Sequence, residues 1–176
     1  VCSCPISRFH QNSGSFYGNF RMHGSERQST GEVLIELLLI ELGDGNLRTE
    51  GRRAFRDAAV AFPGQESDGW WRWTTECLAS LGKKSKIIDG SLADAIELVD
   101  EGAALVLCSP TDPTEWFAVV GHERQKFRVI DDVSKAAAHR ISRGGLKTAL
   151  NRFADEKGRI RFVAMEPGFG RHPGQE

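Results

Sequence analysis

Apolar residues near the start of the chain recur with helical spacing. Val33, Leu34, Leu37, Leu38 and Leu42 fall three or four positions apart, a pattern that places their side chains on one face of a helix. More apolar residues widen this stripe, which predicts a helix that is buried on most of its sides: Ile35, Leu39 and Ile40.

The ends of this first helix are predicted from its flanking residues. Ser29 and Thr30 precede the apolar stripe, and hydroxyl side chains at that place are typical of N-caps. The run Gly43–Asn46 follows the stripe and is rich in residues that end helices. The pattern therefore predicts a helix that starts at Ser29–Thr30.

Two more helices are predicted before the middle of the chain. The first covers Leu47–Ala61, with apolar residues on one face, and ends before Pro63. The second covers Trp70–Leu81, and Gly82 stands where a glycine closes a helix. Positions 70 and 73 share a face of that helix and position 71 points elsewhere. Either one tryptophan is an exposed interface anchor, or two lie in the core and one lies along the surface.

The second half of the chain alternates short apolar runs with turn residues. Ser91 and Asp94 are spaced as a capping box at the start of a helix, and the run Ala103–Cys108 is typical of a strand buried on both faces. Lys86–Ile88, Trp116–Val120, Lys126–Ile130 and Ile160–Met165 are further predicted strands, and Leu146–Phe153 a further helix. Helices followed by a mostly antiparallel sheet predict an α+β fold.

Composition restricts the classes of function. The chain has 176 residues, 40% of them hydrophobic, and a net charge of −1, which suits one globular domain and gives no reason to expect a nucleic-acid partner. No apolar run reaches the length of a membrane span, and there is no phosphate-binding loop motif. The four cysteines fit neither a disulfide framework nor a zinc pattern. We therefore expect no metal and no cofactor, and a cytoplasmic location.

The composition also changes along the chain. Residues 1–25 are rich in Ser, Gly, Asn and aromatic residues without periodicity, so we expect a disordered or irregular tail there. Residues 26–166 carry the periodic elements and form the predicted domain. Residues 167–176 are rich in Gly and Pro, and we expect a flexible tail.

The stretch Lys86–Ser134, with its order of strand, capped helix, buried strand and hairpin, resembles the second half of a C39-type cysteine peptidase domain. The resemblance covers about residues 28 to 165. It implies a papain-like fold with N-terminal helices packed on the sheet. Domains of this family commonly stand at the N-terminus of bacterial ATP-binding-cassette exporters of toxins and peptides.

Two of the three catalytic positions of that family are replaced here. Thr30-Gly31 matches its cysteine-glycine pair, Trp116 matches its histidine and Asp131 matches its aspartate. Gln28 is the nearby glutamine, although it stands too close to Thr30 for the family spacing. Threonine has no accessible anion near neutral pH and indole has no proton-accepting nitrogen. Trp116 either fills the cleft that the imidazole would occupy or packs in the core.

The leading functional hypothesis is a pseudoenzyme. In it, a degenerate domain binds a substrate or leader polypeptide, or docks on the membrane and ATPase domains of an exporter at the inner face of the plasma membrane. The expected contact residues are Gln28, Thr30, Trp70, Trp116 and Asp131. Two alternatives stay open: an active cysteine peptidase that uses Cys108 or Cys77 to process leader peptides, and a purely structural papain-like domain.

Overall fold

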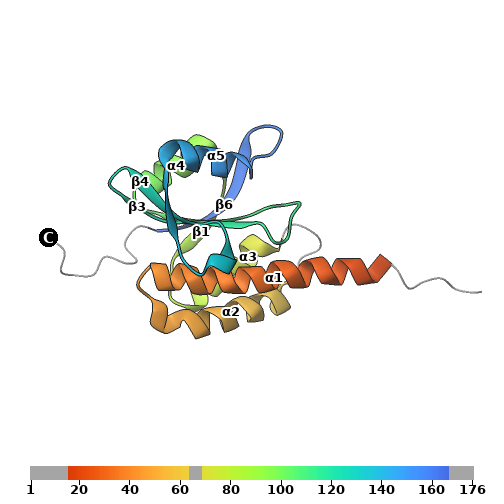
Figure 1. Cartoon of the computed structure of the whole chain (residues 1–176). Coiled ribbons are helices and arrows are strands. Elements are labelled where there is room, and N and C mark those ends of the chain that lie inside the picture. Colours follow the sequence, from red (N-terminus) through yellow and green to blue (C-terminus); the bar gives the residue numbers. More distant parts are fainter. Residues whose placement is uncertain (1–15, 64–68, 167–176) are drawn as a thin grey trace, which may run out of the picture.

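A computed structural model describes residues 16–63 and 69–166. Three N-terminal helices, α1 (Phe16–Glu41), α2 (Arg48–Ala61) and α3 (Trp70–Ser80), lie on one side of a sheet (Figure 1). Two shorter helices, α4 (Leu92–Asp100) and α5 (Arg143–Asn151), lie on its other side. None of the described helices has the length and apolar character needed to cross a membrane.

The described strands form one antiparallel sheet. They are β1 (Ser85–Ser91), β2 (Ala104–Cys108), β3 (Trp116–Glu123), β4 (Lys126–Ile130), β5 (His139–Ser142) and β6 (Arg159–Met165). Their order across the sheet is β1-β6-β2-β3-β4-β5, and each neighbouring pair is antiparallel. The last strand therefore lies between the first two. The predicted α+β class is confirmed.

The sheet separates two hydrophobic cores, and β2 contributes to both. Ala104, Val106 and Cys108 face the core under α1, α2 and α3, whereas Leu105 and Leu107 face the core under α4 and α5. Alternate residues of a strand point to opposite faces, so a strand between two apolar layers must be apolar throughout. The prediction of a strand buried on both faces is confirmed.

The predicted start of the first helix is wrong. Helix α1 begins at Phe16, so Ser29 and Thr30 lie inside it and cap nothing, and residues 16–25 are helical instead of irregular. Residues 16–28 contain no proline, and extending a helix that is already nucleated costs less than starting one, so α1 continues through this segment despite Gly18 and Gly24. The remainder of the two predicted tails, residues 1–15 and 167–176, lies outside the described residues.

Other local predictions hold more closely. The capping box is present, because Asp94 N–H donates to Ser91 Oγ over 3.1 Å and Ser91 N–H donates to Asp94 Oδ2 over 2.7 Å. Gly82 follows α3 with φ +75°, a conformation that favours glycine. Strand β5 was not predicted, because its four residues hold a single large apolar side chain, Ile141.

Candidate functional site

Trp116 begins β3 at the position that the resemblance matches to a histidine. Its side chain is 2% exposed. The rings of Phe55 and Trp70 contact it edge-on, with centroids 5.8 Å and 5.7 Å away. The indole Nε1 is buried and has no hydrogen-bond partner among the described residues. Of the two predicted alternatives for Trp116, the structure favours packing in the core.

The segment matched to the nucleophile lies directly against this indole. A Cβ atom added at Gly31 would stand 2.8 Å from Trp116 Cζ2 and 2.5 Å from Phe55 Cζ, so only glycine fits between α1 and β3 here. The structure thus brings the Thr30-Gly31 pair and Trp116 together. However, Thr30 and Gly31 lie in the interior of α1. The backbone N–H groups there are bonded within the helix and are not free to stabilise a thiolate or an oxyanion.

Asp131 is not directed at Trp116. It follows β4, and its Oδ2 lies 3.5 Å from Nε2 of His139 in β5, with both side chains about two fifths exposed. Strand pairing explains this arrangement, because β4 and β5 are neighbours and Val129 is registered opposite His139. The sequence did not point to this pair, since strand β5 itself was not predicted.

Gln28 stabilises the helical layer. Its side-chain amide donates to Glu32 Oε1 over 3.2 Å. Glu32 is 5% exposed and accepts two hydrogen bonds from Arg56 of α2, of 3.0 Å and 2.9 Å. Burial opposes ionisation of Glu32, but the bonds from Arg56 and Gln28, with the charge of Arg52, outweigh it and hold the pKa of Glu32 below its usual value. Gln28 therefore supports an ion pair between helices.

The two described cysteines are protected thiols. Cys77 donates to the Gly51 carbonyl and Cys108 to the Ser109 carbonyl. Burial raises the pKa of each thiol to about 12, and for Cys108 the charge of Arg27 opposes that effect only in part. Neither thiol is ionised near neutral pH, as a nucleophile must be. The described residues also hold no cluster of His, Cys, Asp and Glu that suits a metal ion.

A hollow of about 310 Å³ opens beside the Trp116 cluster, and we call it the β1–β6 hollow. Two of its lining residues contact Trp116 from different sides: Trp70 through its ring, and Cys108 as the β2 partner of Trp116 in the strand register. The lining comprises Trp70, Asp89, Cys108, Pro110, Phe153, Asp155, Arg159, Ile160 and Arg161. Trp70 was predicted as a contact residue, and it belongs to this wall although its side chain is only 3% exposed.

The charges that line the β1–β6 hollow are paired within its wall. Arg161 donates to both carboxylate oxygens of Asp89, over 2.7 Å and 3.1 Å, and its guanidinium carbon lies 5.5 Å from the ring centroid of Trp71. The bond from Arg161 lowers the pKa of Asp89. Asp155 accepts from the Arg159 backbone N–H and forms an ion pair of 3.5 Å with its side chain. The hollow therefore combines charge-balanced ion pairs with the largely buried rings of Trp70 and Phe153.

Local sequence signals did not reveal this hollow. Asp89 and Arg161 are registered opposite each other in β1 and β6, 72 positions apart in the sequence. Trp71 is half-buried beneath Arg161, whereas Trp70 and Trp73 are buried. The three tryptophans thus follow the alternative with two core residues and one along the surface.

Comparison with known proteins gave no match. No protein-family model, curated protein or solved structure matched this chain.

Proposed function

We propose that this chain is a non-catalytic, C39-peptidase-like domain of papain-like fold that binds a polypeptide segment. The segment is a substrate or leader polypeptide, or part of an exporter on which the domain docks. Three features support the relation: the element order, the antiparallel hairpin that Trp116 begins, and the contact between that residue and the Thr30-Gly31 segment.

One observation carries the non-catalytic assignment. The position that the resemblance matches to the catalytic imidazole is taken by Trp116, whose indole lies against Gly31 and is enclosed by Phe55 and Trp70. An indole cannot accept a proton. Because α1 continues through Thr30, the helix N-terminus that would activate a nucleophile is also missing from this place.

The binding site that we propose is the β1–β6 hollow, which includes Trp70 but none of the other expected contact residues. Its volume of about 310 Å³ is at the lower end for ligand pockets and suits one or two side chains. Among the described strands, β1 pairs with β6 alone, so its other side is an open sheet edge. An extended segment can add to such an edge while an apolar side chain enters the adjoining hollow.

A permanently unfolded polypeptide without net negative charge, reduced and carbamidomethylated ribonuclease A, is a direct probe of this function. Pro110 is exposed at the rim, so Pro110→Trp fills the hollow without disturbing the core, and we expect it to weaken binding at least tenfold. Pro113→Trp, in the same loop but outside the lining, is the matched control and should bind like the parent chain. Equal binding by both variants would contradict the proposed site.

A purely structural domain is the second candidate, and the burial of Trp116 favours it. This hypothesis predicts a different result in the same titration: the parent chain would not bind the unfolded probe at any concentration tested. The third hypothesis, an active peptidase, requires an ionised and accessible thiol, and the raised pKa values of Cys77 and Cys108 weigh against it.

A further inference from the structure

A second opening lies at the other end of the sheet, where the β3–β4 hairpin turns beside β5. We call it the hairpin pocket. It has a volume of about 510 Å³ and is lined by Glu123, Arg124, Gln125, Lys126 and Arg140. The hairpin pocket lies at the end of the sheet formed by β3, β4 and β5, whereas the β1–β6 hollow lies at the other end of the strand order.

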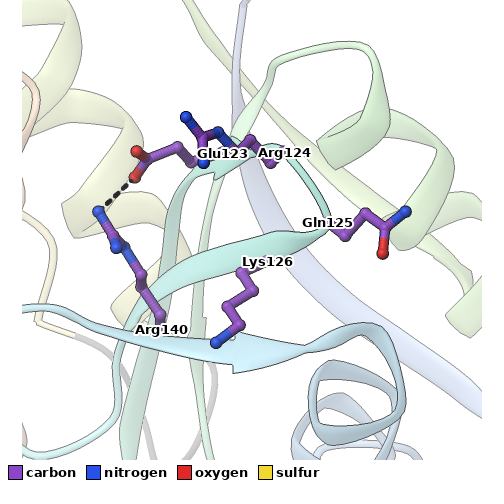
Figure 2. Close-up of a pocket in the computed structure, with 5 residues that line it drawn as sticks. All are labelled: Glu123, Arg124, Gln125, Lys126 and Arg140. Carbon is purple, nitrogen blue, oxygen red and sulfur yellow. Dashed lines mark hydrogen bonds and ion pairs between the residues drawn. The ribbon is translucent and has the colours of Figure 1, made fainter.

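The hairpin pocket carries a surplus of positive charge. Three cations and one carboxylate line it. Arg140 is paired with Glu123, with 2.8 Å between Nη2 and Oε2. The structure gives Arg124 and Lys126 no hydrogen-bond or ion-pair partner among the described residues. Figure 2 shows Arg140 reaching from β5 toward Glu123, while Lys126 extends from β4 toward β5.

Neighbouring charges do not cancel this surplus. Arg128 is registered opposite Arg140, and two cations at directly opposite positions repel each other. Arg128 is held by its own partner, Glu41 at the end of α1, which also accepts from the Ala138 N–H. Glu123, the carboxylate that lines the pocket, and Glu41, the partner of Arg128, are therefore each engaged by one arginine, and Arg124 and Lys126 stay available to a ligand.

The backbone at the turn keeps a charged residue where glycine is easier to place. Arg124 has φ 57°, in the left-handed region that residues with a side chain rarely adopt. Such conformations persist where the surroundings or a function hold them. The result is a charged residue, instead of a glycine, in the turn of the hairpin.

The edge of the sheet indicates what kind of anion fits. Strand β5 ends the sheet and pairs with β4 alone among the described strands, so its outer main-chain groups can pair with an added strand. A phosphate site is typically built from converging backbone N–H groups or a helix N-terminus, whereas the charge here comes from separate side chains. Anionic membranes attract clusters of about four to eight basic residues, and two unpaired cations fall short of that.

We propose that the hairpin pocket binds an acidic, extended polypeptide segment, which pairs with the edge of β5 and directs its carboxylates at Arg124 and Lys126. This proposal is independent of the β1–β6 hollow, because it rests on different strands and different residues. It adds a charge-selective interaction surface to the domain.

Fluorescence anisotropy with a labelled peptide of alternating Glu and Val tests the proposal. We expect the parent chain to bind it, to bind more weakly as salt increases, and not to bind the matching Lys–Val peptide. The double variant Arg124→Glu/Lys126→Glu should lose at least tenfold in affinity. Lys147→Glu/Lys157→Glu, an equal charge change at exposed positions elsewhere, should stay within twofold of the parent.

Further experiments distinguish strand pairing from charge attraction alone and check that the variants are folded. Methylation of alternate backbone nitrogens of the Glu–Val peptide removes its strand-pairing donors and should weaken binding at least fivefold. Circular dichroism confirms that the double variant is folded, and the single variant Lys126→Gln replaces it if it is not. Pro110→Trp should not change this binding, which separates the proposal from that for the hollow.

Three results would overturn the proposal. The first is no binding of the Glu–Val peptide by the parent chain at low salt. The second is an equal loss of affinity in the control pair. The third is displacement of the peptide by inorganic phosphate or by phosphatidylserine vesicles, because that result would assign the pocket to a phosphate-bearing ligand.

Discussion

The β1–β6 hollow and the hairpin pocket lie at opposite ends of the strand order of one sheet. They differ in whether the charged side chains that line them are paired with each other. In the hollow, Arg161 and Arg159 are paired with Asp89 and Asp155 inside the wall. In the hairpin pocket, Arg124 and Lys126 have no such partner among the described residues. The fields of paired charges largely offset each other, whereas unpaired cations attract anions and respond to salt.

This difference indicates two modes of recognition on one domain. Binding in the hollow should depend on apolar contact with Trp70 and Phe153 and change little with ionic strength. Binding at the hairpin pocket should weaken steeply as salt screens the two cations. If binding at both sites responded in the same way to salt or to the same substitution, the two modes of recognition would not be distinct.

The largest effect is expected at Trp116. Trp116→Ala removes a fully packed indole and leaves a cavity, so it should reduce the free energy of unfolding by about 3–5 kcal/mol. Trp116→Phe also removes the buried N–H that has no partner, and should cost no more than about 2 kcal/mol. Urea unfolding at neutral pH measures both values.

The same variants test whether binding at the two sites is independent. Trp116 contacts two residues of the hollow and none that line the hairpin pocket. Under conditions where Trp116→Ala stays folded, it should weaken binding of the unfolded probe and leave the affinity for the Glu–Val peptide unchanged. A parallel loss at both sites would contradict their independence.

A smaller effect is expected from Glu32, which lines neither opening. Glu32→Gln removes the charge that accepts from Arg56, and it should cost about 1–3 kcal/mol, reduced by the half-exposed position of Arg56. The pKa of Glu32 is lowered on folding, so its contribution is present above the ordinary value of 4.5 and is lost as pH falls through the folded value.

Urea titrations of the parent and Glu32→Gln at several pH values check this dependence. The difference in unfolding free energy should be full near neutral pH and should vanish in acid. The affinities of Glu32→Gln for the unfolded probe and for the Glu–Val peptide should stay within twofold of the parent near neutral pH. The variant should lower the stability of the fold without changing either binding site. A constant difference at all pH values would exclude the assigned ion pair.

Periodicity and capping were sufficient to predict α2, α3, α4, β2 and the β3–β4 hairpin, because these elements depend on nearby residues. The capping box of Ser91 and Asp94 is an example in which four residues determine a helix start. The start of α1 was mispredicted, since hydroxyl residues that suit a cap also fit inside a helix. Local patterns do not report whether the preceding segment stays helical.

The candidate sites were less predictable for a different reason. The role of Trp116 depends on contacts with Gly31, Phe55 and Trp70, which come from three helices. The hollow depends on pairing between β1 and β6, and the hairpin pocket depends on β5, a strand of four residues. Pairings between distant segments leave no periodic signal, so only the folded chain reveals them.

The most direct test of the central claim, that neither cysteine of the described residues is an activated nucleophile, is alkylation of Cys77 and Cys108 by iodoacetamide near neutral pH. Mass spectrometry of a Cys2→Ser/Cys4→Ser chain follows each thiol separately. We predict that both react only as fast as the protein unfolds and that urea accelerates them together. A thiol that reacts in the folded protein at least as fast as free cysteine would contradict the account.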